Sequence, residues 1–322
     1  MGREEKMQST KFVPAYACWL AYFCAIASVW LTFHYPIYAD AALWNGLAAH
    51  IISTVCIFCF SFYYSNTSIY DPFWCYIPIT LAIGWMSKPS QPSQRAYLAV
   101  VLLIVWCARY AIQFPWTGWL SGISHEDWRY VEIAKKTGSN TPLYWLASLI
   151  SLHLTPTLLV FAAISPVERV FSRDAATSLP FNQMDLLGVV VCLAAILLQH
   201  FADTTLFQFR AKAYGSGKDL DYKSNSKKIC QNGVWKYSRH PNYYGETLFW
   251  LGLAIIAYAG KTEVSVTNYD HVRDWIGAVI ILGFFRVSAH LTDQRMLKNR
   301  GDKYQHVMDT VSPLIPFPTW LP

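Results

Sequence analysis

The sequence predicts an all-α membrane protein, a polytopic helical bundle of seven to eight transmembrane helices. Of the 322 residues, 54% are hydrophobic and only 14% are charged, whereas soluble domains carry about a quarter charged residues. The charges are also bunched, since Asp40 is the only formal charge between Phe12 and Tyr70. About 20 apolar residues cross the hydrocarbon core as a helix, which satisfies its own backbone amides. Long uncharged runs therefore predict spanning helices.

These runs give the elements in order along a single membrane domain, 1–322, with N-terminal helices in 12–198 and a part richer in polar signals in 199–322. The first run is longer than a signal-peptide core and lacks a small-x-small cleavage site, so it predicts a permanent helix. The run after Asp71-Pro72 is short and could be broken or half-inserted, which leaves seven or eight spans. Helices are expected over 12–32, 46–64, 73–86, 97–114, 142–164, 184–208, 245–260 and 274–291.

Lysine and arginine indicate the orientation. They are concentrated in 210–238, where acids are few, and again in 295–303. Because such residues stay on the cytoplasmic side of a membrane, the 210–242 loop and the C-terminus are expected in the cytoplasm, with two helices between them. Arg169 and Arg173 fall on the opposite side in this arrangement and count against it.

The eight cysteines fall mostly within apolar runs. Cys56 and Cys59 have the spacing of a redox or zinc motif, but no second pair accompanies them. We interpret them as small buried apolar residues. No metal site and no nucleic-acid partner is expected.

The most informative segment is Arg239-His240-Pro241-Asn242-Tyr243-Tyr244-Gly245-Glu246, here called the octet. It follows a basic loop and precedes the uncharged run 247–260, an arrangement that predicts an anionic ligand held at the membrane surface. The basic residues could instead mark the cytoplasmic side or bind anionic lipid headgroups. Pro241 rigidifies the turn and Gly245 admits close packing. His240 is a candidate general acid, although a lone histidine is more often a hydrogen-bonded structural group.

Ionisable residues inside apolar helices are expensive, so each is a functional candidate. Asp203 and Arg210 lie two helical turns apart and share a face, on which Gln199 lies one turn earlier. Arg210 could instead simply reach the cytosol from the helix end. The chain has no GxGxxG segment and no Walker loop, so a nucleotide would bind outside those two schemes. Further candidates of this kind are Arg109, Glu246 and Arg286.

From about Gln199 to the C-terminus, the chain resembles the steroid 5-alpha-reductase C-terminal domain family, and specifically its DUF1295 branch. The resemblance rests on Gly233-Val234-Trp235 followed by the octet, and on Asp203 with its spaced arginine. The family's membrane reductases hold NADPH among their C-terminal helices and reduce a carbon–carbon double bond of a lipid-like substrate. The resemblance therefore implies an NADPH-dependent oxidoreductase acting on a steroid, sterol or fatty enoyl substrate, located in the endoplasmic reticulum. Further matching pieces are Trp106-x-x-Arg109, Glu126-Asp127-Trp128-Arg129-Tyr130, Ala202-Asp203 with Phe209-Arg210, Tyr304, and Ser312-Pro313-Leu314-Ile315-Pro316.

The resemblance also implies roles for single residues. Asp203, Arg210 and Asn242 match cofactor-contacting residues of the family. Lys228 falls where steroid reductases have a cofactor-contacting arginine, and Arg109 matches an arginine near the nicotinamide end. The residues expected to bind the cofactor are Arg109, Asp203, Arg210, Lys228, Arg239, Asn242, Glu246 and Arg286.

The chain departs from the family where the substrate is protonated. Steroid reductases polarise the substrate carbonyl with a tyrosine and a glutamate. Trp106 occupies the tyrosine position and cannot protonate an enolate, whereas Asp71 lies near the expected place of the glutamate. Asp71, Tyr243 and Tyr244 are the candidate proton donors. To donate at neutral pH, Asp71 needs a pKa raised by burial.

Two other functions are compatible with the sequence. Membrane methyltransferases of the isoprenylcysteine carboxyl type share the Arg-His-Pro-x-Tyr-x-Gly element. However, they continue with an apolar aromatic residue, an Asn-Pro and a Glu-Glu pair, where this chain has Glu246, no Asn-Pro, and Asp293-Gln294. A non-enzymatic lipid or sterol binder is the second alternative, and Trp106 favours it. A transporter is not expected, because no internal repeat is visible.

Overall fold

The computed structural model describes residues 12–39, 41–113, 121–214, 228–261 and 268–316. The chain divides into two compact units, Met1–Ser178 (unit 1) and Leu179–Pro322 (unit 2). Each unit is described by itself. Within the described residues every regular element is helical.

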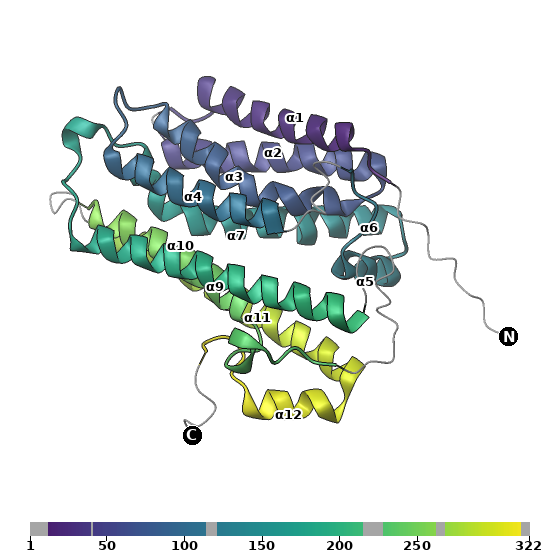
Figure 1. Cartoon of the computed structure of the whole chain (residues 1–322). Helices are drawn as coiled ribbons and strands as arrows, with labels where there is room; N and C mark the ends of the chain where they lie inside the picture. Colours follow the sequence, from purple (N-terminus) through teal and green to yellow (C-terminus); the bar gives the residue numbers. More distant parts are fainter. Residues whose placement is uncertain (1–11, 40, 114–120, 215–227, 262–267, 317–322) are drawn as a thin grey trace. The chain divides into compact units, whose positions relative to one another are not determined.

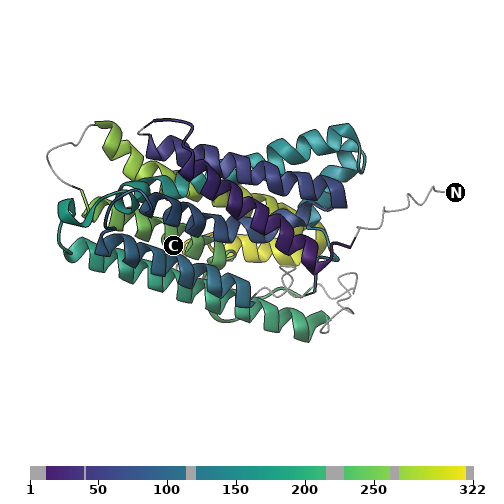
Figure 2. The same ribbon diagram turned by 90° about the horizontal axis from the view of Figure 1, so that it is seen from above.

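Unit 1 is a bundle in which the helices α1 to α4 and α7 lie alongside one another, and α1 runs next to α2 in both views (Figure 1, Figure 2). The side chain of Asn66 caps the short turn before α3, and the side chains of Asp127 and Thr141 cap α5 and α6, by accepting hydrogen bonds from backbone N–H groups. The elements are α1 (Ala15–His34), α2 (Ala42–Tyr64), η1 (Thr67–Ile69), α3 (Tyr70–Met86), α4 (Gln94–Gln113), α5 (Trp128–Thr137), α6 (Pro142–Ala147), the π-helix η2 (Ser148–Leu154), α7 (Thr155–Ile164), η3 (Ser165–Val167), α8 (Glu168–Phe171) and η4 (Ala175–Thr177).

Unit 2 is built on the close pairing of two helices, α9 and α10. Glycines let their backbones approach: a Cβ on Gly252 would lie 2.5 Å from Cys192 Sγ and 2.9 Å from the carbonyl oxygen of Gly188. Such small residues are typical of helix pairs in membranes. The elements are α9 (Gln183–Tyr214), η6 (Gly233–Lys236), α10 (Pro241–Ala259), α11 (Asn268–Arg300) and α12 (Asp302–Thr310).

The apolar helices support a membrane protein. Six helical segments in the described part of the chain are long and apolar enough to cross a membrane. All eight predicted helices are present. Because α3 and α10 are not among the six candidate spans, the expected count of seven to eight spans is not confirmed. The six segments are Ala15–His34, Ala42–Tyr64, Gln94–Gln113, Pro142–Phe171, Gln183–Ala213 and Val272–Arg300.

Two boundaries differ from the prediction in ways that matter for the site. The helix expected from 245 begins at Pro241, so most of the octet forms its first two turns. Proline suits this position because its missing N–H would have no partner in the first turn. The helix expected over 274–291 continues to Arg300, which places Asp293 on α11. The boundary between the units falls before α9, at Ser178 and Leu179.

Candidate functional site

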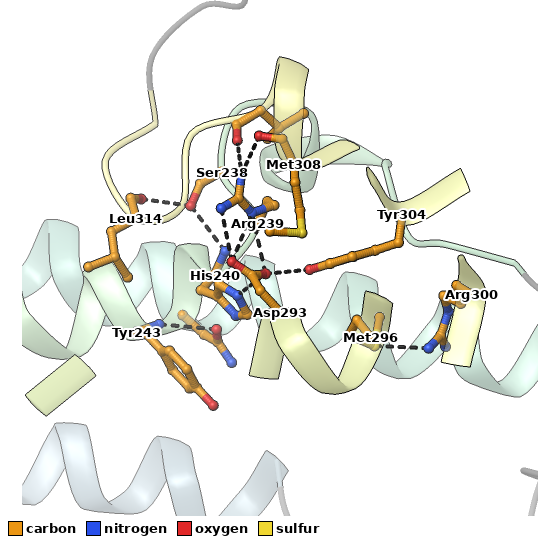
Figure 3. A network of polar contacts seen from close by, with 12 residues as sticks. Ser238, Arg239, His240, Tyr243, Asp293, Met296, Arg300, Tyr304, Met308 and Leu314 are labelled. Carbon is orange, nitrogen blue, oxygen red and sulfur yellow. Dashed lines mark hydrogen bonds and ion pairs between the residues drawn. The ribbon is translucent and has the colours of Figure 1, made fainter. Parts of the chain in front are cut away.

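The first part of the octet is held by a buried carboxylate on α11 (Figure 3). Arg239 Nη2 donates to Asp293 Oδ2 at 2.9 Å, and Arg239 Nε lies 3.1 Å from the same oxygen. The remaining guanidinium nitrogen, Nη1, donates to the backbone carbonyls of Met308 and Val311. Since Asp293 is only 1% exposed, the arginine supplies the countercharge that a buried carboxylate requires.

Two further side chains complete this arrangement. His240 Nε2 lies 2.9 Å from Asp293 Oδ1, and the Tyr304 hydroxyl donates to the same oxygen at 2.5 Å. Burial, followed by the hydrogen bond to Asp293, raises the pKa of the Tyr304 phenol. His240 is thus hydrogen-bonded within the protein, and its ring stacks on Tyr243 at 5.2 Å. We call Arg239, His240, Asp293 and Tyr304 the Asp293 network.

The C-terminal tail is tied to the same place. The Ser238 hydroxyl donates to the carbonyl of Leu314 at 2.6 Å, and the backbone N–H of Arg239 donates to the carbonyl of Ser312 at 2.8 Å. The sequence predicts that Arg239 contacts cofactor phosphates. That role stays a prediction; in the structure the guanidinium nitrogens have partners on α11, on α12 and directly after α12.

A second cluster lies where α9 meets the start of α10. Asn242 Nδ2 donates to Asp203 Oδ1 at 3.0 Å, while Asn242 Oδ1 accepts the backbone N–H of Tyr243 at 3.0 Å. Asp203 is 8% exposed, and Gln199, one turn earlier on the same face of α9, is 1% exposed. We call Gln199, Asp203 and Asn242 the Gln199 cluster. Asp203 and Asn242, two of the eight residues that the sequence predicts in one cofactor site, are therefore in direct contact.

Gln199 has an unusual environment. Neither its amide nitrogen nor its amide oxygen has a hydrogen-bond partner among the described residues. Gly245 packs against its stem, because a Cβ on this glycine would lie 2.6 Å from Gln199 Cγ and 3.1 Å from the Ala195 carbonyl oxygen. A buried amide without partners costs about 1–3 kcal/mol. The arrangement therefore favours a ligand that both donates to and accepts from this amide.

Basic side chains lie at the exposed end of the same helix. Arg210 is exposed and lies two turns beyond Asp203. Burial raises the pKa of the Cys230 thiol, and the nearby positive charge of Arg210 opposes that rise. Lys228 is also exposed, and its carbonyl accepts a hydrogen bond from Arg300 Nε at 3.1 Å. Residues 215–227 of the predicted cytoplasmic loop lie outside the described residues.

The remaining octet residues face different surroundings. Glu246 is buried and accepts a hydrogen bond from Trp250 Nε1 at 2.9 Å. The Tyr243 ring contacts Phe285 on α11 at 5.1 Å, next to Arg286, whose side chain is exposed. Tyr244 is half-buried.

Unit 1 holds the predicted acid, Asp71, at the start of α3 and outside the six candidate spans. The Tyr130 hydroxyl donates to Asp71 Oδ1 at 2.5 Å. Burial, with a further contribution from the Asp127 charge, raises the pKa of Asp71 from 3.8 to about 7, against the opposing effect of the Tyr130 hydrogen bond. Tyr130 is itself 5% exposed. The sequence predicts the acid but not this tyrosine, although Tyr130 lies in one of the segments that carry the resemblance.

Tyr130 is positioned by the segment that precedes α5. Glu126 Oε1 accepts the backbone N–H of Thr67 at 2.8 Å, and the backbone N–H of Asp127 donates to the Ser68 hydroxyl at 3.0 Å. Burial raises the pKa of Glu126. The loop before α5 is thereby docked on the turn between α2 and α3, so that Asp71 and Tyr130 meet.

Arg109 and Trp106 also belong to unit 1, on α4. Arg109 Nη1 donates to Gln113 Oε1 at 3.3 Å, and its guanidinium lies 5.7 Å from the centre of the Tyr110 ring. Trp106 is fully buried, with its ring 5.6 Å from that of Trp74. Among the described residues, no three histidine, cysteine or acidic side chains are gathered as metal ligands would be.

Comparison with known proteins places the chain in a family. The family described as "Protein of unknown function (DUF1295)" matches residues 57–311, most of the chain. The chain belongs to the DUF1295 family. The matched range contains the Gln199 cluster, the octet, the Asp71–Tyr130 pair and Asp293.

Two relatives of this DUF1295 protein are similar at low identity. An uncharacterized protein of Schizosaccharomyces pombe is 22% identical over 262 residues, which cover 78% of this chain and 73% of the relative. The human DNA damage-regulated autophagy modulator protein 2 is 27% identical over 110 residues, which cover 34% of this chain and 38% of that protein. No solved structure matches the chain.

Proposed function

We propose that this DUF1295 protein is an integral membrane oxidoreductase that uses NADPH to reduce a carbon–carbon double bond of a lipid-like substrate. The observation that carries the proposal is the Gln199 cluster. It combines a buried amide that has no hydrogen-bond partner among the described residues, a buried carboxylate and a second, oriented amide, and exposed basic residues lie nearby. The resemblance to membrane reductases supplies the reaction class, and the apolar helices supply the membrane setting.

The residues of unit 2 suit the chemistry of a nicotinamide nucleotide. Such a molecule offers a carboxamide and sugar hydroxyls, which can pair with the Gln199 amide and the Asp203 carboxylate. Its phosphates suit the exposed cations Arg210 and Lys228. When bound, NADPH supplies the hydride.

The Asp293 network has an indirect role in this proposal. Arg239 fixes the start of α10 and thereby fixes the direction in which Asn242 projects. We therefore assign the cofactor phosphates to Arg210 and Lys228 and assign Arg239 to positioning. Asp293 is bonded to three side chains of this network, so in this proposal it serves the protein's own structure.

Hydride addition to an activated alkene creates negative charge that must be stabilised or protonated. For unit 1 by itself, we propose Asp71 as a proton donor, because it is paired there with the Tyr130 hydroxyl. A carboxyl with a pKa of about 7 is partly protonated at neutral pH, so Asp71 can release a proton there. Tyr130 places a phenol beside it, which compensates for Trp106 at the family's tyrosine position. An endoplasmic reticulum location, with the 210–242 loop and the C-terminus in the cytoplasm, completes the proposal.

Ligand-dependent thermal stability of the purified protein in detergent tests the cofactor assignment. NADPH is expected to raise the melting temperature, and S-adenosylmethionine, the methyltransferase cofactor, is not. Arg210→Ala should weaken NADPH binding about tenfold or more, since a hydrogen bond to a charged group contributes about 1.5–3 kcal/mol. Lys298→Ala removes an exposed charge near the end of α11 and serves as the matched control, with binding unchanged.

A second variant separates binding from folding. Gln199→Leu removes the unpartnered amide at similar volume, so it should leave the apo protein as stable or more stable while NADPH binding falls about tenfold. Absence of NADPH binding by the wild-type protein would overturn the proposal. So would Arg210→Ala protein that binds NADPH as tightly as the wild type.

A further inference from the structure

The core of unit 1 contains two histidines in one column of aromatic rings. His50 lies on α2, with its ring 6.0 Å from that of Phe73. Phe73 contacts Tyr70 at 5.4 Å, and Tyr70 contacts His153 at 5.1 Å. Both histidines are 0% exposed. They therefore share the same apolar, aromatic surroundings and can be compared directly.

His153 has hydrogen-bond partners on both ring nitrogens. Its Nδ1 lies 3.0 Å from the carbonyl oxygen of Ser148, and its Nε2 lies 3.2 Å from the hydroxyl of Ser61. His153 belongs to the π-helix η2, whose wider turn directs the ring toward α2. The cost of burying this imidazole is offset within the protein.

His50 has none. Neither Nδ1 nor Nε2 has a hydrogen-bond partner among the described residues. The nearby hydroxyls serve other acceptors: Ser53 donates to the His50 backbone carbonyl, and Thr54 is hydrogen-bonded to Thr157. The ring lies between Phe73 on α3 and Phe161 on α7, the latter at 6.4 Å. Buried polar groups without partners are rare in native proteins, and each calls for an explanation.

We propose that His50 is the polar anchor of a ligand site in unit 1 that takes the hydroxyl group of an apolar alcohol. A neutral imidazole carries one N–H donor and one acceptor nitrogen, and a hydroxyl can pair with either. The rings of Phe73 and Phe161, 6.0 Å and 6.4 Å from the imidazole, suit an apolar skeleton. A charged headgroup does not fit, because an ionised group buried among these rings would lack a countercharge.

The position of the site indicates how the ligand arrives. His50 is enclosed by α2, α3 and α7, and residues on the outer faces of these helices, such as Ile52 and Leu158, are exposed as in a lipid-facing bundle. An apolar alcohol concentrates in the bilayer, which these exposed side chains would face. The site lies wholly within unit 1, so it does not depend on the cofactor proposal for unit 2.

The first test compares the two histidines in lipid-stripped protein, using leucine because its volume is similar. His50→Leu removes a group without partners and should raise the melting temperature by about 2–4 °C, the shift expected for one polar group in a unit of this size. His153→Leu removes a group with partners, leaves the Ser61 hydroxyl without its partner and should lower the melting temperature by at least as much. Equal destabilisation by the two variants would overturn the proposal.

The second test measures the ligand. Cholesterol, geranylgeraniol and hexadecan-1-ol are each added to the full chain in detergent, beside the hydroxyl-free hydrocarbon of the same skeleton. At least one alcohol is expected to raise the melting temperature of the wild-type protein more than its hydrocarbon does. His50→Leu should weaken binding of that alcohol about tenfold, the effect of one hydrogen bond between neutral groups.

A rescue variant guards against a general loss of packing. His50→Gln keeps a donor and an acceptor in the core and should retain part of the preference for the alcohol over the hydrocarbon. If no alcohol is preferred to its hydrocarbon, or if the preference survives in His50→Leu, the site is refuted.

Discussion

Replacing Asp71 by asparagine should remove a pH dependence of stability that the wild-type protein carries. The pKa of Asp71 is raised from 3.8 to about 7 in the folded chain. At low pH the carboxyl is protonated in both the folded and the unfolded state, and its contribution to stability is fully present. As the pH rises from 3.8 toward 7, the unfolded state releases the proton while the folded state retains it, so stability is lost until the folded pKa is passed.

The magnitude follows from the shift. A difference of about 3 pKa units corresponds to at most about 4 kcal/mol of unfolding free energy. Asparagine keeps the oxygen that accepts the Tyr130 hydroxyl and does not titrate. Asp71→Asn should therefore match the wild type near pH 4 and exceed it at pH 7.5, with a melting temperature higher by up to about 10 °C for a unit of this size.

The assay is thermal unfolding of the full chain in detergent, followed by intrinsic fluorescence at pH values from 4 to 8. Glu132→Gln is the matched control, because it removes an exposed carboxyl on α5 whose partner is the exposed Lys135. The control should follow the wild type at every pH. A gap between Asp71→Asn and the wild type that stays constant across this range would refute the argument.

Three further outcomes are expected from the same measurement. Asp293→Asn leaves the buried guanidinium of Arg239 without its countercharge and should cost about 3–5 kcal/mol; a loss below about 1 kcal/mol would contradict the network. Gly245→Ala should lower the free energy of unfolding by about 1–3 kcal/mol, because the new Cβ would lie 2.6 Å from Gln199 Cγ. Gly283→Ala is its control: nothing lies within 4 Å of the new Cβ, so this variant should raise the free energy of unfolding by up to about 1 kcal/mol. Tyr130→Phe removes a hydrogen bond that lowers the pKa of Asp71. Because the folded-state pKa of Asp71 then rises further, the pH-dependent loss of stability should extend to higher pH.

Local patterns in the sequence predict most of the helices, because uncharged runs and chain length are local properties. They also place Gln199 and Asp203 on one face of a helix, since positions four apart always share a face. The start of α10 is predicted too late because the octet is polar, although Pro241 is a good first helical residue. The count of seven to eight spans is not confirmed, because six described segments are long and apolar enough to cross a membrane and α3 and α10 are not among them.

The partners of the site residues depend on contacts between distant parts of the chain. Arg239 and Asp293 are 54 positions apart, and Asp71 and Tyr130 are 59 apart. Nothing in the local sequence specifies that α11 presents an acid to the octet, so an arginine in a basic region is interpreted as a phosphate ligand. The cofactor assignments of Asp203 and Asn242 remain predictions, although their contact with each other is now described.

The tie between the octet and the tail has a consequence for biosynthesis. Met308, whose carbonyl binds the Arg239 guanidinium, follows it by 69 positions. At about 5–20 residues per second, a ribosome needs roughly 3–14 s to reach it. Asp293, the partner of both Arg239 and His240, is made 54 and 53 positions after them, and until Met308 follows the start of α10 lacks one of its ties. A nonsense codon between 243 and 293 would therefore leave Arg239 and His240 without Asp293, although the three residues of the Gln199 cluster had already been made.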